Sequence, residues 1–123
     1  MALYRCKIEM TYNGPLLNAT SLRGYLFTPL ATILSTKYGV KSRTTLTIRG
    51  NGYFVSMYFK YLDTKTRDTL VTYVFKVTVD IITSDLTMLV NLLEDFYGVF
   101  YAQNLQRYFT IEKVDMEQIG SEE

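Results

Sequence analysis

The chain has 123 residues, which is enough for one domain built around one hydrophobic core. Because 48% of the residues are apolar and 20% are charged, we expect a folded globular domain rather than a disordered chain. The net charge is only +1. There is no histidine, which excludes histidine-based catalysis and a histidine-ligated metal. Cys6 is the one cysteine, which excludes an intramolecular disulfide.

No apolar run approaches the roughly 18 residues of a membrane span, and no basic-then-apolar leader opens the chain. We therefore expect a soluble cytoplasmic protein without membrane contact and, if it is viral, one that acts in the cytoplasm of the host cell. We expect no cofactor and no metal site.

The first predicted element is a strand over residues 3–12, whose side chains alternate between an apolar face and a polar face. Asn13, Gly14 and Pro15 end it, as turn residues do. Cys6 lies on the apolar face, so we expect a small buried side chain rather than a reactive thiol.

A helix is predicted over residues 29–38. Thr28 offers a capping hydroxyl, and Pro29 stands at the first helical position, where its missing N–H costs nothing. Gly39 follows as a left-handed terminator. Residues 19–27 then form either a short separate helix or a continuation across a kink at Pro29.

A glycine-rich segment, Gly50-Asn51-Gly52, separates a predicted strand over residues 44–49 from a second one over residues 53–62. As a phosphate-binding loop it would have to lead into a helix, but the residues that follow are typical of a strand. The preferred interpretation is a tight hairpin, in which glycine and asparagine adopt positive φ.

The same segment, with its neighbours Arg49 and Tyr53, resembles the RNA recognition motif, which has a basic residue, glycine, an aromatic residue, glycine or alanine, and then an aromatic-flanked strand. Asn51 and Ser56 stand where that motif has aromatic residues. The resemblance implies that bases stack on the sheet, and it is the alternative to a plain hairpin.

Residues 69–83 carry the strongest strand pattern of the chain, after a polar connection over residues 63–68. At about 3.3 Å per residue this strand would exceed ~40 Å, so we expect a bulge or a bend.

Ser84 and Asp85 cap a second predicted helix, with the carboxylate at its positive end. Gly98 in this helix is expected to allow close packing on the sheet, and a last strand follows over residues 107–116. One broad apolar stripe is expected to be the buried side of the helix: Leu86, Leu89, Val90, Leu93, Phe96, Tyr97 and Phe100.

The order β-α-β-β-β-α-β predicts an α+β fold, a two-layer sandwich of a mainly antiparallel sheet of about five strands with two helices, as a ferredoxin-like variant. We expect a single domain over residues 1–119 and an acidic C-terminal tail over residues 120–123. The half over residues 69–101 resembles in pattern the small dimeric subunit of the KEOPS tRNA-modifying complex.

Two helices can cover only one face of such a sheet, yet apolar side chains fall on both faces. Phe54, Tyr58, Leu70 and Val74 lie on the second face and form the candidate interface for a second copy or another protein. The alternative is that the segment over residues 13–28 covers part of this face.

Four basic residues, Lys37, Lys41, Arg43 and Arg49, follow one another without an acidic residue between them. With Tyr53 they form a candidate patch for nucleic acid or for an acidic partner. The alternative is an ordinary solvated face.

The carboxylates offer no catalytic pair, because Glu94 and Asp95 are neighbours on a helix and diverge by about 100°. We therefore expect a non-catalytic protein-interaction module that acts as a homodimer, or as a small subunit or inhibitor of a larger, nucleic-acid-processing complex. Virus-encoded inhibitors of host complexes are small chains of this kind. The alternative is a protein that binds RNA or single-stranded DNA through a basic and aromatic sheet surface.

Overall fold

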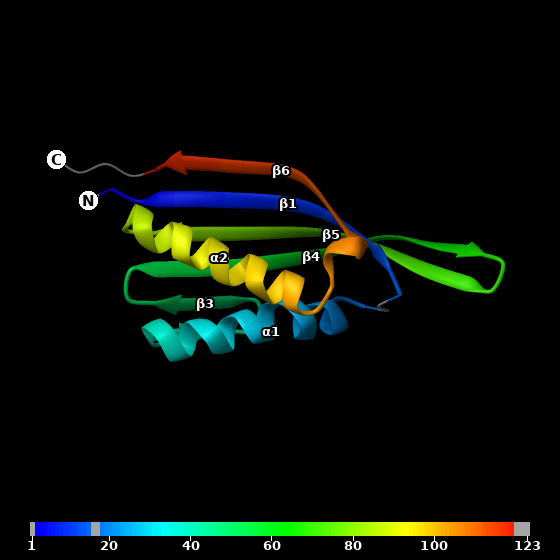
Figure 1. Cartoon of the computed structure of the whole chain (residues 1–123), viewed down its shortest axis with the longest axis horizontal. Coiled ribbons are helices and arrows are strands. Elements are labelled where there is room, and N and C mark those ends of the chain that lie inside the picture. Colours follow the sequence, from blue (N-terminus) through cyan, green and yellow to red (C-terminus); the bar gives the residue numbers. More distant parts are fainter. Residues whose placement is uncertain (1, 16–17, 120–123) are drawn as a thin grey trace.

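The computed structural model describes residues 2–15 and 18–119. These residues form an α+β fold with a six-stranded sheet in the order β2-β3-β4-β5-β1-β6, in which every pair of neighbours is antiparallel (Figure 1). Along the chain the elements are β1 (Tyr4–Gly14), α1 (Ala19–Tyr38), β2 (Ser42–Arg43), β3 (Thr47–Gly50), β4 (Tyr53–Arg67), β5 (Leu70–Thr83), α2 (Leu86–Ala102), the 3₁₀ turn η1 (Gln106–Tyr108) and β6 (Phe109–Gln118).

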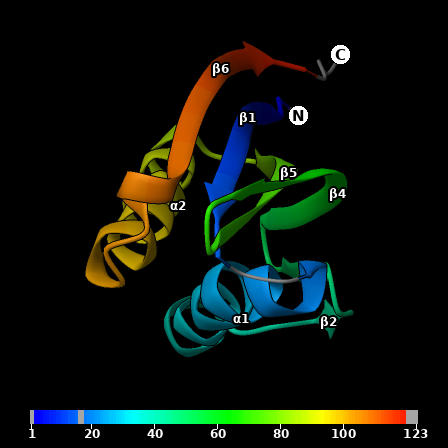
Figure 2. The same cartoon turned by 90° about the vertical axis from the view of Figure 1, so that its right-hand side faces the viewer.

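The α+β class and the antiparallel sheet are therefore confirmed. The sheet has six strands rather than about five, because residues 42–43 pair with β3 as a separate short strand. The ferredoxin-like arrangement is not established by this sheet. α1 and β2 lie at one end of the sheet, and β6 lies at the other end, beyond β1 (Figure 2).

The core lies between the helices and the sheet face that they cover. Alternate residues of β1 point into it, from Cys6 to Tyr12, and the same holds for β5 from Phe75 to Ile81. Cys6 is fully buried, as predicted, and this burial raises the pKa of its thiol. Neither α1 nor α2, the α-helices of the described residues, lies over the opposite face of the sheet, which we call the open face.

α1 begins ten residues earlier than predicted. Asn18 caps it by accepting a hydrogen bond from the Ser21 N–H at 2.9 Å, and the helix continues through Pro29. The prediction of a start at Pro29 is wrong, and the alternative of a continuous helix is correct. Pro29 has no N–H for the carbonyl of Tyr25, one turn earlier, but the side-chain amide of Gln103 donates to that carbonyl instead.

β4 and β5 form a hairpin that is longer than the rest of the sheet. β1 pairs with β5 only as far as Tyr73, whereas β4 and β5 stay paired to Arg67 and Leu70. The end of the hairpin therefore projects as a two-stranded arm, seen at the right of Figure 1. The expected irregularity occurs in the partner strand, between Tyr61 and Asp63 of β4, and residues 63–67 are strand rather than a loop.

α2 begins after Asp85, whose carboxylate accepts from the Thr87 N–H at 3.1 Å, so the predicted cap is confirmed. Its buried side is rotated from the predicted stripe. Leu92 and Val99 are buried, whereas Leu86 and Val90 are exposed. The buried residues are Leu89, Leu92, Phe96, Val99 and Phe100.

The rotation has a physical reason: α2 packs on α1 as well as on the sheet, which turns its buried side toward α1. Asp95 lies on that side, where it accepts a hydrogen bond from Lys37 of α1 at 2.8 Å. The predicted role of Gly98 is wrong, because a Cβ atom there would meet nothing within 4 Å.

Candidate functional site

One side of α2 carries apolar side chains that the fold leaves uncovered. They recur at helical spacing, so they share one side of the helix, away from the side on which Asp95 meets α1. Tyr97 in this row lies near Cys6 of β1: burial raises the pKa of the Tyr97 phenol, and Cys6 raises it further. The row therefore faces the β1–β6 end of the sheet. Its members are Leu86, Val90, Leu93, Tyr97 and Tyr101.

β6 carries a second uncovered row. Met116 pairs with Cys6, and Val114 pairs with Ile8, so the side chains of β6 point to the same face of the sheet as the core residues of β1. Ile111, Val114 and Met116 are nevertheless exposed to 42%, 46% and 52%, while Cys6 and Ile8 are fully buried. The helix layer thus ends over β1 and leaves β6 bare.

We call these two rows together the α2–β6 surface: Leu86, Val90, Leu93, Tyr97, Tyr101, Ile111, Val114 and Met116. Leu93 and Tyr97 are partly buried against the core, and the other six are exposed. At one end the two elements are held together by aromatic contacts, since the rings of Phe100 and Phe109 lie 5.0 Å apart. The surface is thus part of a packed unit rather than of a separate segment.

The backbone of β6 is also unused on its outer side. β6 is the last strand of the sheet, and none of the described residues pairs with its outer side. The Ile119 N–H donates to the Leu3 carbonyl at 2.7 Å. Because backbone groups alternate in direction along an antiparallel strand, the N–H and C=O of Met116 and Val114 point outward. The α2–β6 surface therefore includes a row of hydrogen-bonding groups open to a further strand.

The structure does not bring together the four predicted interface residues. Phe54 and Tyr58 do lie on the open face, where Phe54 is half-buried and Tyr58 is 59% exposed. Leu70, 61% exposed, lies on the projecting arm instead. Val74 is only 7% exposed, because it sits between two paired strands, beside Asn13 of β1 and Asp63 of β4.

The open face otherwise carries paired charges. The Arg5 guanidinium contacts the Asp80 carboxylate at 2.6 Å, and Lys76 contacts Glu9 at 3.3 Å. The segment over residues 13–28 does not cover this face with its helical part, since residues 19–28 belong to α1 on the other side. Residues 16–17 of that segment lie outside the described residues.

The predicted basic patch is also divided. Lys37 points to α2, where its hydrogen bond and charge interaction with Asp95 raise its pKa. The Arg43 guanidinium lies over the ring of Phe27, 5.9 Å from its centroid. These two cations thus interact with neighbouring side chains.

Tyr53 is buried rather than presented to a ligand. Its hydroxyl donates to the Gly39 carbonyl at 2.7 Å, and burial raises its pKa. The aromatic residue that faces the open side is its neighbour Phe54. The sequence contained the signal for this, because Arg49 and Phe54 are directly opposite across the hairpin and so share a face.

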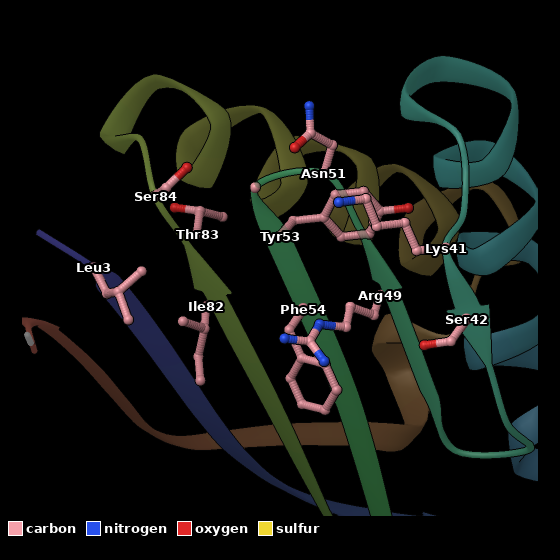
Figure 3. A pocket seen from close by; sticks show the side chains of 12 residues that line it. Leu3, Lys41, Ser42, Arg49, Asn51, Tyr53, Phe54, Ile82, Thr83 and Ser84 are labelled. Carbon is pink, nitrogen blue, oxygen red and sulfur yellow. The ribbon is translucent and has the colours of Figure 1, made fainter. Parts of the chain in front are cut away.

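Lys41 and Arg49 remain together at a pocket of about 780 Å³ at the end of the open face (Figure 3). Figure 3 shows the Arg49 side chain beside Phe54. Neither cationic side chain has a hydrogen bond or ion pair with any residue in 2–15 or 18–119. A cation beside an aromatic ring suits a ligand with a phosphate and a flat ring.

The turn beside this pocket is a hairpin, as predicted. Gly50 pairs with Tyr53, and β4 rather than a helix follows, so no phosphate-binding loop exists there. Within this turn, Gly52 takes a positive φ of 84°, and Asn51 does not.

Across the described residues, no group of three or more Cys, Asp or Glu side chains is placed to hold a metal ion. Nor does either described helix have the length and apolar character needed to cross a bilayer. A comparison with models of known protein families finds no match, and a comparison with curated proteins finds no significant relative.

Proposed function

We propose that this chain is a non-catalytic protein-interaction module that self-associates through the α2–β6 surface. The observation that carries the proposal is that α2 and the edge strand β6, joined by the Phe100–Phe109 contact, each leave a row of apolar side chains exposed. Six of their side chains are exposed: Leu86, Val90, Tyr101, Ile111, Val114 and Met116.

Two physical properties of this surface favour association with protein. Contiguous exposed apolar side chains of this kind mark interfaces, because burying them removes apolar area from water. A free strand edge adds directional hydrogen bonds to that gain, as in binding by strand addition. A net charge of +1 gives little repulsion between copies.

In this proposal a homodimer is the working form, and the dimer acts as a small subunit or inhibitor of a larger complex. The projecting arm of β4 and β5 lies away from β6, and so do Arg49 of β3 and Lys41, whose N–H donates to the Arg49 carbonyl. They stay available to a further partner when two copies associate.

A second candidate function, binding of RNA or single-stranded DNA, is favoured by one observation. Arg49 lies beside Phe54 at a pocket that Lys41 also lines, and neither cation makes an ion pair with the described residues (Figure 3). Phosphate contacts from the cations and stacking on the ring would give sequence-tolerant binding that weakens with salt.

The proposal is tested by light scattering on a size-exclusion column, which gives the mass of the particle. We expect the parent chain near twice 14.3 kDa. Val90→Asp places a carboxylate on the α2–β6 surface and should give the monomer with an unchanged circular dichroism spectrum, because a desolvated charge opposes association. Tyr58→Asp, at a similarly exposed site of the open face, is the matched control and should stay dimeric.

A parent chain that elutes as a monomer would contradict the proposed function. A mass that rises only when a single-stranded oligonucleotide is added, and falls back in Arg49→Glu, would establish the second candidate in its place.

A further inference from the structure

We propose that the second copy binds with its β6 antiparallel to the first β6, about a two-fold axis that passes through Val114. This inference rests on the proposed function and specifies the geometry of that same surface. The backbone, the charges and the apolar side chains of β6 each support it.

The backbone permits this pairing. The N–H and C=O of Val114 point away from β1, as the bond between Ile119 and Leu3 requires. With the axis at Val114, its N–H donates to the carbonyl of Val114 in the second copy, and the reverse bond forms by symmetry. β6 runs from Phe109 to Gln118, so Val114 lies near its middle, and regular pairing covers residues 113–115 of each copy, with the shifted residues 109–112 beyond it.

The axis must pass through a residue rather than between two residues. Paired side chains lie on the same face of a sheet, so a residue can pair only with one an even number of positions away. The regular part of β6 starts at Lys113, because its register with β1 shifts on the other side of that residue. The candidates for the axis are the regularly paired residues nearest the middle of β6, which are Lys113, Val114 and Asp115.

The charges select among these three. With the axis at Val114, Lys113 of each copy lies opposite Asp115 of the other, which gives two pairs of opposite charge on the open face. Within one chain these side chains already share that face, with the Lys113 Nζ 3.4 Å from the Asp115 Oδ2. Both are more than half exposed, so they are free to reach across.

The two other axes are disfavoured by the same rule. An axis at Lys113 places lysine opposite lysine, and an axis at Asp115 places aspartate opposite aspartate. Of the three, Val114 alone avoids like charges at the centre.

On the helix side, the same axis places Val114 against Val114 of the second copy. The apolar row of each α2 then lies on the same side of the joined sheet as the apolar rows of β6, and the two Val114 side chains leave water together. The two sheets become one continuous antiparallel sheet, with the helices of both copies on one side and both open faces on the other.

A disulfide tests the position of the axis. In Val114→Cys the two thiols lie opposite each other with Cα atoms about 5.5 Å apart, which a disulfide can span. Mild oxidation should therefore give a covalent dimer on a non-reducing gel. Asp115→Cys is the matched control, because its two copies would lie more than about 7 Å apart and should not cross-link. The native Cys6 is buried and should give no dimer in the parent chain.

A charge exchange tests the pairing without a covalent bond. Lys113→Glu and Asp115→Lys should each raise the dimer dissociation constant about tenfold, because each creates two pairs of like charge. The combination of both restores opposite charges and should bring the constant back to within about threefold of the parent value. Analytical ultracentrifugation measures all four proteins.

The outcomes separate the two proposals. A monomeric parent chain overturns the proposed function and this inference together. A dimeric parent in which Asp115→Cys cross-links and Val114→Cys does not, or in which the double exchange fails to restore the dimer, overturns the axis at Val114 alone. Cross-linking of Val114→Cys with recovery in the double exchange establishes it.

Discussion

The two edges of the sheet end in different ways. At one edge β2 has two residues, Ser42–Arg43, and α1 lies beside it with a fully buried apolar side. The Arg43 guanidinium lies over Phe27 of α1, and the Lys41 N–H already donates to the Arg49 carbonyl at 2.8 Å. At the other edge β6 is ten residues long, and the helix layer stops short of it.

Edge strands invite pairing with other chains, and proteins usually limit this with short strands or with cover from a helix or loop. The β2 edge is protected by the shortness of β2, although both of its residues are exposed. The β6 edge keeps its length, its outward hydrogen-bonding groups and an apolar row on the helix side, with its charges on the open side. The difference supports the proposal that the sheet continues at β6 into a second copy.

The largest effect on stability is expected at a buried leucine of α1, and we compare it with an exposed leucine of α2. Leu34 of α1 is fully buried near the β2 edge, and Leu86 of α2 is 49% exposed on the α2–β6 surface. Leu34→Ala should lower the free energy of unfolding by about 2–5 kcal/mol. Leu86→Ala should lower it by less than about 1 kcal/mol, measured by urea denaturation at concentrations that keep the chain monomeric.

Similar losses in the free energy of unfolding for the two leucines would contradict this difference between the edges of the sheet. They would mean that the α2 row belongs to the core of the single chain, so that the end of the sheet at β6 is as closed as the end at β2.

A smaller effect concerns the hydrogen bond to α1 from Gln103, the residue that follows α2. Gln103→Ala removes the donor to the Tyr25 carbonyl, and we expect a loss of about 0.5–1.5 kcal/mol. In a Pro29→Ala background the loss should shrink, because the alanine introduced there supplies its own backbone N–H to that carbonyl. Thermal or urea unfolding of the four proteins of this cycle measures the coupling.

Gln106→Ala is the control for this cycle. Gln106 is exposed and donates to the Asn104 side chain in its own turn, so its removal should change stability by less than about 0.5 kcal/mol. An equal loss from Gln103→Ala with and without Pro29 would show that the amide does not replace the missing helical bond.

The smallest expected effect is a gain in stability that should be the same in α1 and in α2. Gly24 of α1 and Gly98 of α2 are exposed helix positions where a Cβ atom would meet nothing within 4 Å. Gly24→Ala and Gly98→Ala should each stabilise the fold by about 0.5–1 kcal/mol, because alanine loses less backbone entropy. Gly39→Ala should destabilise it, since Gly39 has a φ of 77°. A loss at Gly98 alone would show that the space beside it is used.

Much of the fold could be predicted from local sequence pattern. The predictions that were wrong depend on contacts between residues far apart in the chain. The alternation in β1 and the glycine turn before β4 were readable, because both depend on adjacent residues. The extent of α1 was not, because the group that compensates for Pro29 is Gln103, 78 residues from its acceptor in the chain.

The sequence revealed an excess of apolar side chains but not its place. Alternation tells which face a side chain takes, and it does not tell where a helix layer ends. The row on β6 was hidden further, because the shift in register before Lys113 puts Ile111 and Val114 on one face although they are an odd number of residues apart. The row on α2 did have a readable helical spacing.

The bond from Gln103 to Tyr25 has a consequence for the order in which the chain folds. Before α2 docks, only water can donate to the carbonyl of Tyr25, and residues 19–28 and 29–38 are two short helical segments of marginal stability on their own. We therefore expect α1 to be completed at Pro29 only when a part of the chain made much later packs against it. A contact that forms so late would act mainly on how slowly the native chain unfolds.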